Sequence, residues 1–306
     1  MPCIIGTRGS ALALWQAHAV QEMLQSRYPE LQVQIEIIHT TGDIILDRPL
    51  SNIGDKGLFT KELEVALMEG RIHLAVHSLK DLPTQLPAGL TLAAVTQRER
   101  PEDALVAPAG TTIETLPHGG TVATGSLRRR AQLLRLRPDL NVVDVRGNVP
   151  TRLQKYQTNG WDGMILAYAG LHRLGLGEHI AQIIPTDQMV PAVGQAALGL
   201  ETRADDAATI GLLRGIEHPP TRICTDAERA LLRRLEGGCQ TPIAAHATLA
   251  EDHLTLHAMI ASLDGSTIIG GGMNGLPAEA ENVGNQLAED LIERGGKGVL
   301  GRGLMG

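Results

Sequence analysis

The feature that most limits the fold of this chain is a strand–helix–strand pattern that occurs twice. Its first occurrence predicts strands at 3–7, 33–40 and 72–77, separated by helices at 11–27 and 60–69. Alternating strands and helices of these lengths are typical of an α/β domain with a mainly parallel sheet. The predicted fold class is therefore α/β.

The same pattern begins again near Thr121. It predicts strands at 121–124, 141–146 and 162–166 and helices at 127–137 and 149–158. The turns before the two first helices are also alike: Thr7-Arg8-Gly9-Ser10 and Thr124-Gly125-Ser126. We infer that the two units arose by structural duplication.

Two or three domains are expected, because 306 residues exceed what one hydrophobic core usually fills. Polar or Pro/Gly-containing stretches near 98–103 and 190–195 indicate two crossings between the α/β units, so the chain returns to its first domain. The predicted division is domain 1 at 1–97 with a return segment at 196–216, domain 2 at 98–195, and domain 3 at 217–306.

Domain 3 is predicted to be a small α+β unit. A helix, three strands and a last helix are expected at 225–236, 244–249, 254–262, 267–271 and 278–294. In domain 1, the stretch 42–57 has no sustained periodicity and is expected to be a long exposed loop.

Composition excludes several function classes. The net charge is −7 and aromatic residues make up 2% of the chain, with a single Phe59, which argues against nucleic-acid binding. No stretch approaches eighteen uninterrupted apolar residues, and the start has no signal-peptide pattern, so we expect a cytoplasmic protein. Three cysteines without paired spacing predict neither a disulfide framework nor a metal site.

Cys239 is the most prominent candidate functional residue. It follows Gly237-Gly238 at the predicted end of a helix and stands shortly before Pro242. A cysteine at an arbitrary position is usually buried filler, but the glycine turn predicts that Cys239 lies on an accessible loop. Cys3 in a strand and Cys224 before a helix have no such context and receive no role.

Arginines gather at predicted strand ends and helix starts. Arg8 and Ser10 begin the first helix, and Thr124, Ser126, Arg128 and Arg129 surround the start of its counterpart. The segment from Arg146 and Gly147 to Arg152 repeats this arrangement after the next strand. Ligands of α/β sheets bind outside the carboxyl ends of the strands. Arginine pairs with carboxylates through two parallel hydrogen bonds, which lysine cannot do, so an anionic ligand is predicted.

Lys80 and Asp81 follow another predicted buried strand, at its carboxyl end. A carboxylate beside cationic groups can exchange protons with a bound amine, which makes Asp81 the candidate acid and base. The competing interpretation is a turn aspartate before Pro83, and the two are about equal on sequence grounds.

The segment from Glu228 to Ile243, with Leu235-Glu236-Gly237-Gly238-Cys239 at its centre, resembles the signature of the hydroxymethylbilane synthases, also called porphobilinogen deaminases. Leu232 and Ala245 are its minor departures. Further blocks resemble this family in the same order along the chain: 6–10, 57–64, 77–81, 125–129, 146–148 and 193–195.

This resemblance implies a fold, a cofactor and a reaction. The first two domains would resemble type II periplasmic binding proteins, with the active site in their cleft. Domain 3 would carry Cys239 on a loop, joined by a thioether to a dipyrromethane cofactor that is assembled from porphobilinogen. On this primer the enzyme would link four porphobilinogen molecules into hydroxymethylbilane and release ammonia, as a step of porphyrin and heme biosynthesis.

The resemblance also assigns roles to residues. The catalytic set would be Asp81, Lys80 and Arg8. The cofactor-binding set would be Cys239, Ser10, Lys56, Asp81, Thr124, Ser126, Arg128, Arg129, Arg146 and Gly147. The substrate-binding set would be Arg8, Arg146, Arg152, Arg173 and Gln195. No metal, nucleic acid or membrane is expected; the protein would be a monomer that passes its product to uroporphyrinogen-III synthase.

Two other function classes remain at the level of sequence. Two α/β lobes with arginines at their strand ends would also suit a small-anion receptor, although the missing export signal and the third domain count against it. A thiol-dependent enzyme would use Cys239 directly and need a histidine base, for which His246 is the nearest in sequence but lacks an orienting group.

Overall fold

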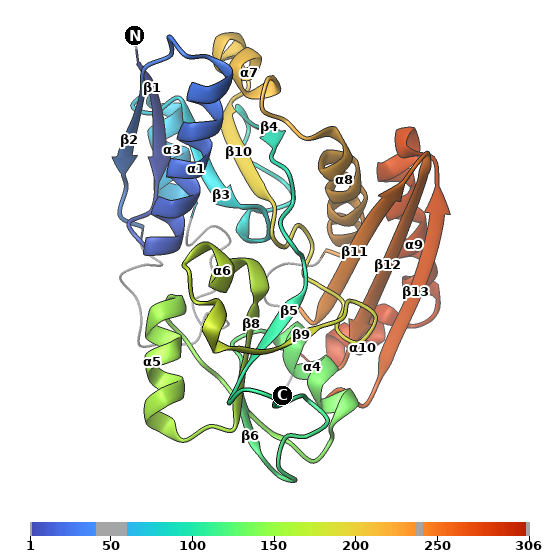
Figure 1. Cartoon of the computed structure of the whole chain (residues 1–306). Coiled ribbons are helices and arrows are strands. Elements are labelled where there is room, and N and C mark those ends of the chain that lie inside the picture. The colour runs from blue at the N-terminus through green and yellow to red at the C-terminus, as the bar shows by residue number, and fades with distance from the viewer. Residues whose placement is uncertain (1, 41–59, 237–240, 304–306) are drawn as a thin grey trace. The chain divides into compact units, whose positions relative to one another are not determined.

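The computed structural model describes residues 2–40, 60–236 and 241–303. The described chain forms two compact units, one made of 1–99 and 196–222 and the other of 100–195 and 223–306. Both contain sheets and helices, and the α/β class predicted from the sequence is confirmed (Figure 1). None of the helices in these described ranges is long and apolar enough to cross a membrane.

The first unit is built on a five-stranded sheet with the order β2-β1-β3-β10-β4. Its strands are β1 (Cys3–Thr7), β2 (Val33–Ile37), β3 (Leu74–Ser78), β4 (Leu90–Val95) and β10 (Leu198–Arg203). Strands β1, β2 and β3 are parallel, and β10 is antiparallel to both β3 and β4. The segment that returns from the second unit therefore completes the sheet of the first.

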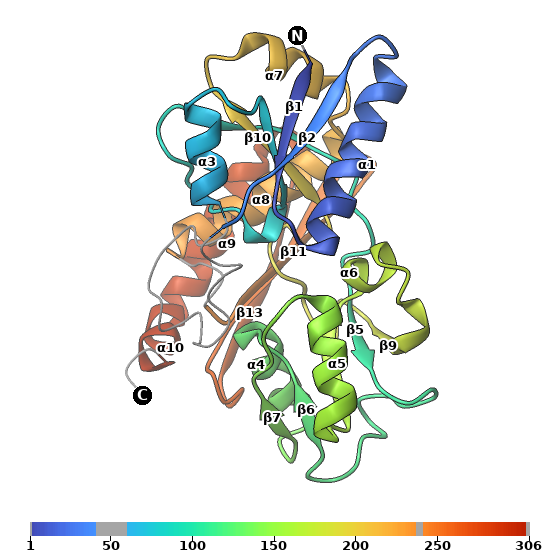
Figure 2. The ribbon, with the colours of Figure 1, turned by 90° about the vertical axis from the view of Figure 1, so that its left-hand side faces the viewer.

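Helices cover both faces of this sheet. Helix α1 (Ala11–Arg27) and helix α3 (Lys61–Met68) lie on opposite sides of it (Figure 2). Their buried residues form separate clusters, one with Ala17 and Val20 and the other with Leu63 and Leu67. Helix α7 (Ala207–Arg214) packs beside β4 and β10. Because both faces of the sheet are covered, the central strand β3 is buried almost throughout, and it begins with three apolar residues.

The second unit begins with a sheet of the same design. Its order is β7-β6-β8-β5-β9, with β6, β7 and β8 parallel and β5 antiparallel to β8 and β9. The strands are β5 (Asp103–Val106), β6 (Thr121–Ala123), β7 (Asn141–Val143), β8 (Gly163–Ala167) and β9 (Ile180–Ile184). The matching order of the two sheets supports the inferred duplication.

The helices of this part are α4 (Leu127–Leu136), α5 (Val149–Asn159) and α6 (Tyr168–Arg173). Helices α4 and α5 each begin at a residue whose side chain accepts a hydrogen bond from the backbone three positions on, Ser126 and Asn148.

A three-stranded antiparallel sheet completes the second unit. It consists of β11 (Ile243–Ala250), β12 (His253–Ala261) and β13 (Ile268–Gly275). Apolar residues of this sheet share one core with helix α8 (Pro219–Arg234) and helix α9 (Ala280–Glu293). Helix α10 (Gly296–Gly303) follows, and short 3-10 turns lie at Leu79–Asp81, Gly177–His179 and Pro277–Glu279.

The comparison with the expected elements gives one clear correction. Helix α8 begins at Pro219, six residues before the expected start, because proline is well tolerated in the first turn of a helix. Strands β4, β5, β9 and β10 were not among the expected elements. The three-domain division stays a prediction, since the contacts divide the chain into two units. The expected loop at 42–57 lies outside the described residues.

Gly284 tests the packing of α9 on α8. A Cβ at this position would overlap the carbonyl oxygen of Ala227 and the Cβ of Ala230. We expect Gly284→Ala to lower the free energy of unfolding by about 1–3 kcal/mol in urea titrations. Gly211 in α7 is a matched control, because a Cβ there has open space; Gly211→Ala should raise stability by about 0.5–1 kcal/mol. Equal effects of the two substitutions would contradict this packing.

Candidate active site

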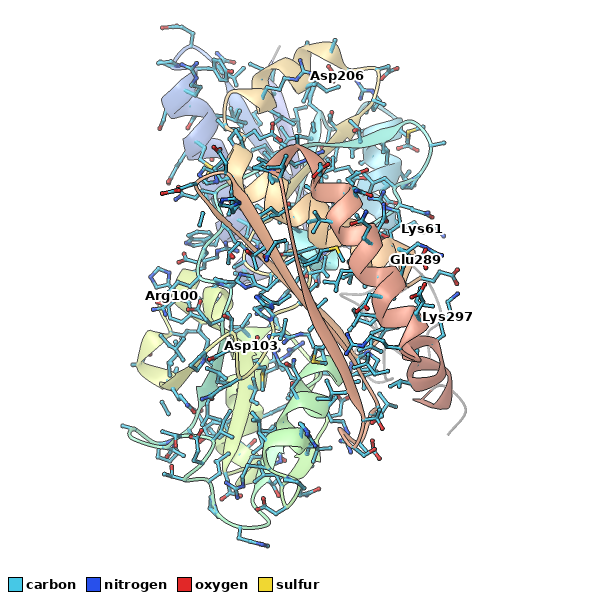
Figure 3. All side chains as sticks on the ribbon, turned by 90° about the vertical axis from the view of Figure 1, so that its right-hand side faces the viewer. Lys61, Arg100, Asp103, Asp206, Glu289 and Lys297 are labelled. Carbon is cyan, nitrogen blue, oxygen red and sulfur yellow. The ribbon has the colours of Figure 1, made fainter. Side chains whose placement is uncertain are left out.

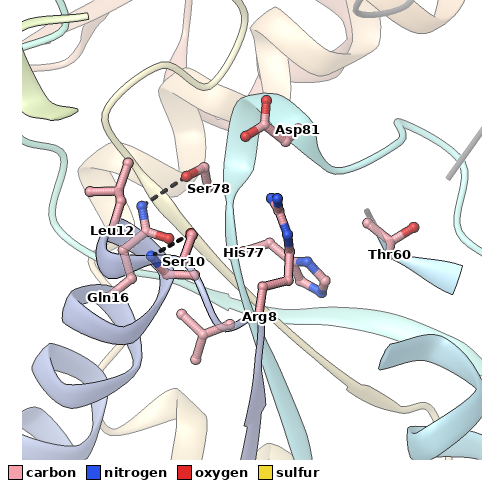
Figure 4. Close-up of a pocket in the computed structure, with 10 residues that line it drawn as sticks. Arg8, Ser10, Leu12, Gln16, Thr60, His77, Ser78 and Asp81 are labelled. Atoms are coloured by element: carbon pink, nitrogen blue, oxygen red, sulfur yellow. Dashed lines mark hydrogen bonds between the residues drawn. The ribbon is translucent and has the colours of Figure 1, made fainter. Parts of the chain in front are cut away.

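A pocket lies where two parallel strands of the first unit end (Figure 4). It is lined by Arg8, Ser10, Leu12, Ala13, Gln16, Thr60, Val76, His77, Ser78 and Asp81. These residues come from the end of β1, the start of α1, the end of β3 and the residue before α3. The pocket therefore occupies the edge of the sheet at which α/β proteins bind their ligands.

Arg8 and Ser10 reach the pocket because β1 ends at Thr7 and α1 begins at Ala11. The Ser10 side chain accepts a hydrogen bond from the Ala13 backbone N–H at 3.3 Å and so caps the helix. The Thr7 hydroxyl donates to the Ala13 carbonyl at 3.0 Å, which holds the turn against the helix. A cationic side chain and a helix start are thus brought together, as the sequence predicted.

Asp81 lies on the 3-10 turn that follows β3, and its side chain borders the pocket (Figure 4). The turn is fixed by Leu79, which is buried and whose backbone N–H donates to the Ala197 carbonyl at 3.0 Å. Lys80 is half-buried on the same turn but does not belong to the residues that line the pocket in the described structure. Arg8 and Asp81 therefore share the pocket, and Lys80 stands beside it.

Four polar lining residues had no predicted role: Gln16, Thr60, His77 and Ser78. The Gln16 side-chain amide donates to the Ser78 hydroxyl at 2.8 Å, across the space between α1 and β3. His77 and Ser78 stand directly before the Leu79–Asp81 turn, so their position at a strand end was the available signal. Gln16 gave none, because one polar residue on the buried side of a helix cannot be told by sequence from a core residue with a hydrogen-bond partner.

In the second unit, the predicted helix starts are present. The Ser126 side chain accepts from the Arg129 backbone N–H at 3.5 Å, and the Thr124 hydroxyl accepts from the Ser126 backbone N–H at 3.4 Å. Both residues follow β6, whose neighbours β7 and β8 run parallel to it. They therefore stand at the carboxyl edge of their own sheet, as Arg8 and Ser10 do in the first unit.

Asp103, at the start of β5, is the partner of both Arg128 and Arg129 (Figure 3 labels Asp103). Arg128 lies 2.8 Å from one carboxylate oxygen of Asp103, and Arg129 lies 2.7 Å from the other. All three side chains are almost fully buried, with exposed fractions of 4%, 6% and 0% for Arg128, Arg129 and Asp103. Sequence analysis assigned both arginines to a ligand and missed Asp103.

This cluster holds two positive charges on one negative charge. Burial alone would raise the pKa of Asp103, but the charges of Arg128 and Arg129 outweigh it and hold that pKa well below its usual range. Burial lowers the pKa of Arg128, and the charge of Asp103 opposes this. The Nε atom of Arg128 is buried and has no hydrogen-bond partner among the described residues. The cluster can therefore accept a further anionic group.

Gln195 supports the same cluster. It is fully buried, and its side-chain amide donates to Asp103 at 2.8 Å and to the Pro101 carbonyl at 2.7 Å. Arg129 is 3.5 Å from the side-chain oxygen of Gln195. The structure thus places Gln195 behind Arg129, and its predicted contact with substrate stays a prediction.

Arg146, Gly147 and Arg152 lie together at the start of α5. Gly147 has a φ of 116°, and a Cβ there would press on Thr151, so only glycine fits this turn well. The Arg152 Nε donates to the Gly147 carbonyl at 2.7 Å. One terminal nitrogen of Arg146 is buried without a hydrogen-bond partner in the described part of the chain. A buried, unpaired guanidinium nitrogen suits an anionic ligand.

The remaining predicted residues divide into two groups. Arg173 is the last residue of α6, and its Nε atom is buried. Cys239 and Lys56 lie outside the described residues.

The cysteines without a predicted role, Cys3 and Cys224, are both buried as expected, and burial raises the pKa of Cys3 to about 11. In the described ranges no group of three or more His, Cys, Asp or Glu residues could hold a metal ion.

Comparison with known proteins identifies the family. A model described as porphobilinogen deaminase, dipyromethane cofactor binding domain, matches residues 3–211, and one for the C-terminal domain of porphobilinogen deaminase matches 222–293. The porphobilinogen deaminase of Desulforudis audaxviator is 52% identical over 299 residues, which cover 98% of this chain and 97% of that protein. That of Chlorobium phaeobacteroides is 48% identical over 301 residues, covering 97% and 96%.

Solved structures with a similar course of chain include the periplasmic VFT2 domain of Bordetella pertussis BvgS. Its TM-score is 0.42 at 16% identity, covering 70% of this chain and 86% of that one. The periplasmic aliphatic sulphonate binding protein SsuA of Escherichia coli has a TM-score of 0.41 at 18% identity, covering 77% and 70%.

The chain belongs to the porphobilinogen deaminase family. It is therefore a transferase of tetrapyrrole biosynthesis, a hydroxymethylbilane synthase that acts on porphobilinogen and carries a dipyrromethane cofactor.

Asp103→Asn tests the energetics of the buried cluster. Because the folded-state pKa of Asp103 is depressed, its contribution to stability is complete above the unfolded-state value of about 4 and is lost as the pH falls toward the folded-state value. We expect Asp103→Asn to lower the free energy of unfolding by about 3–5 kcal/mol at pH 7, because two buried cations lose their counter-charge.

Urea titrations between pH 2 and pH 7 measure this effect, and the difference between the variant and the unsubstituted protein should shrink toward the acid end. The exposed Asp187 is the control, for which Asp187→Asn should change little. An Asp103→Asn protein as stable as the unsubstituted one at pH 7 would contradict the account of the cluster.

Proposed function

We propose that the pocket of the first unit is where porphobilinogen is activated and joined to the growing chain, with Asp81 as the acid and base. Asp81 would protonate the amino group of porphobilinogen as it departs. Its carboxylate would then stabilise the cationic azafulvenium that porphobilinogen becomes, and help remove the proton from the attacked pyrrole carbon.

The observation that carries this proposal is the composition of the pocket. It combines a carboxylate, Asp81, with a guanidinium, Arg8, and a helix start capped by Ser10. Porphobilinogen has a basic aminomethyl group, which becomes cationic when it takes up a proton, and two carboxylates, so a site for it needs groups of both signs. Arg8 and the helix start suit a carboxylate, and Asp81 suits the amine.

Lys80 and Arg8 would support the reaction in different ways. Arg8 would bind a carboxylate and keep Asp81 in an electrostatic environment that favours proton exchange. Lys80 stands on the same turn as Asp81, and its charge would act from beside the pocket.

The arginines of the second unit would hold carboxylates of the cofactor and of the bound units. Each added porphobilinogen brings an acetate and a propionate, so the ligand becomes a polyanion. The net positive charge of the cluster around Asp103 and the unpaired buried nitrogen of Arg146 both suit such a ligand. Arg152, Arg173, Gln195, Thr124, Ser126 and Gly147, together with Ser10 and Lys56 of the first unit, complete the proposed set.

Cys239 would anchor the cofactor through a thioether. In the sequence, Cys239 stands between α8 and β11. Apolar residues of both elements belong to the core of the three-stranded sheet. When bound, the dipyrromethane supplies the pyrrole carbon on which chain growth starts. After four additions, hydrolysis would release the product while the anchor remains.

In the cell, we propose a cytoplasmic monomer that passes its linear product to uroporphyrinogen-III synthase. Membership of the family counts against both alternatives. A small-anion receptor would have no use for Asp81 in its pocket.

Asp81→Asn tests the proposed role. This substitution keeps the size of the side chain but removes the titratable group, so the rate of each addition should fall by about 100-fold or more. Rapid-quench experiments with intact-mass detection measure this rate and, at the same time, the attached cofactor. Asp205→Asn is the matched control, because the Asp205 side chain is 87% exposed. Near-normal turnover of Asp81→Asn would remove Asp81 from the mechanism.

A further inference from the structure

A buried pair of titratable side chains forms part of the pocket wall. His77, on β3, contacts Glu201, on β10, through its Nε2 atom at 2.8 Å from a carboxylate oxygen. The exposed fractions of these side chains are 4% and 0%. His77 lines the pocket together with Arg8 and Asp81 (Figure 4). The roles proposed for Asp81, Arg8 and Lys80 in the reaction involve neither His77 nor Glu201.

The sheet fixes how this pair is held. In the antiparallel ladder of β3 and β10, His77 stands opposite Gly199, and Glu201 follows two residues later on the same face of β10. This face is covered by α3, because Ala75, two residues before His77, packs in one cluster with Leu63 of that helix. The neighbouring strands β3 and β10 thus fix the position of the imidazole, because Glu201 on β10 contacts its Nε2 atom.

The pair is costly as a purely structural feature. The second carboxylate oxygen of Glu201 is buried and has no hydrogen-bond partner among the described residues. A buried carboxylate with one partner usually costs more than an apolar residue of similar volume would. Buried polar groups left partly unsatisfied are typical of functional sites. The position of Glu201 next to a residue of the pocket wall points to such a role.

The arrangement also sets which nitrogen of His77 can act. A buried carboxylate beside Nε2 favours the tautomer in which Nε2 carries the proton, and this leaves the lone pair of Nδ1 available. Nδ1 has no hydrogen-bond partner in the part of the chain that the structure describes. A carboxylate that orients an imidazole in this way is the usual support of a histidine base.

We propose that His77, oriented by Glu201, is a further catalytic residue of the pocket that accepts the proton released by the attacked pyrrole carbon. This proposal rests on the proposed function of the pocket. A bond forms between the attacked pyrrole carbon and the methylene carbon of the activated porphobilinogen, and the C–H bond of the attacked carbon then breaks. Its proton moves to Nδ1 of His77, and its electrons restore the aromatic ring.

The two proton transfers would then begin at different groups, Asp81 for the departing amine and His77 for the attacked ring. Asp81 would help remove the ring proton, as proposed for it, by taking that proton over from His77. The C–N bond of the incoming porphobilinogen breaks with a proton from Asp81, and ammonia leaves. The ring proton that appears later goes to His77, which returns it to solvent or to Asp81 before the next addition. An acid and a base with different surroundings divide these tasks better than one carboxyl group, because each can stay near the protonation state that its step needs.

The charged groups that face His77 come from four elements. Glu201 lies on β10, Arg8 follows β1, Asp81 lies on the turn after β3, and Glu64 lies on α3. Burial and the charge of Glu201 raise the pKa of Glu64, and the charge of His77 opposes this. Two carboxyl groups, those of Glu201 and Glu64, therefore lie near the imidazole on the α3 side.

His77→Gln tests the proposal, because glutamine can still hydrogen-bond to Glu201 but cannot take the proton. The substrate is porphobilinogen, either ordinary or deuterated at its free α-carbon. We expect the rate of each addition to fall by about 100-fold or more. We also expect the deuterium isotope effect on that rate to become larger than in the unsubstituted enzyme, because loss of the base makes C–H cleavage slower than the other steps.

His18→Gln, at an exposed histidine of α1, is the control and should leave the rate and the isotope effect unchanged. A His77→Gln enzyme with an unchanged rate, or one that is slow without a larger isotope effect, would overturn the proposal. The Asp81→Asn enzyme distinguishes the two claims, since its loss of activity should come without a larger isotope effect. If Asp81→Asn is active and His77→Gln is not, the role of Asp81 fails and that of His77 stands.

A measurement on the unsubstituted holoenzyme covers the case in which His77→Gln does not fold. Long-range proton–nitrogen correlation spectra of protein labelled with 15N-histidine report the tautomer of each imidazole, and Glu201→Gln, which keeps the size of the side chain, identifies the signal of His77 by its shift. The proposal predicts a proton on Nε2 and a lone pair on Nδ1. A neutral His77 with its proton on Nδ1 would overturn it.

Discussion

The pairing of β1 with β3 in parallel is the constraint on which the pocket depends. Parallel neighbours end at the same edge of a sheet, so the residues after Thr7 and after Ser78 meet although more than sixty positions separate them in the sequence. One strand delivers Arg8 and the capped start of α1, and the other delivers Asp81 on a short turn. The strand β10 then adds the carboxylate that holds His77 from behind.

Charge balance distinguishes the two α/β sheets. The pocket of the first unit contains cationic and anionic side chains together, which suits proton exchange with an amine. In the second unit, two buried arginines share the single carboxylate of Asp103, and Arg146 has a buried nitrogen without a partner among the described residues. An excess of positive charge without an exchangeable carboxyl group suits the holding of carboxylates. Duplication of one sheet design has thus produced two different chemical environments.

The sequence predicted the repeated strands and helices well, because their apolar periodicity is local and because capping side chains, Ser10, Ser126 and Asn148, precede α1, α4 and α5. It did not predict β10 or β5, since a strand that pairs with distant partners has no local signature beyond its apolar run. Asp81, Arg8 and Ser10 were predicted from their places at strand ends and a helix start, and the structure places all three in the lining of one pocket. Asp103, Glu201 and the role of His77 were missed, because a buried ion pair between residues far apart in sequence is visible only after folding.

The central claim is that this chain builds its product on a primer held by Cys239 and extends it at the pocket around Asp81. The intact mass of the purified protein, with a Cys239→Ser variant beside it, tests this most directly. The account predicts an added mass equal to two porphobilinogen units less their ammonia in the unsubstituted protein, and none in the variant. An unsubstituted protein that carries no addition and that porphobilinogen fails to modify, or a variant that keeps the addition, would contradict it.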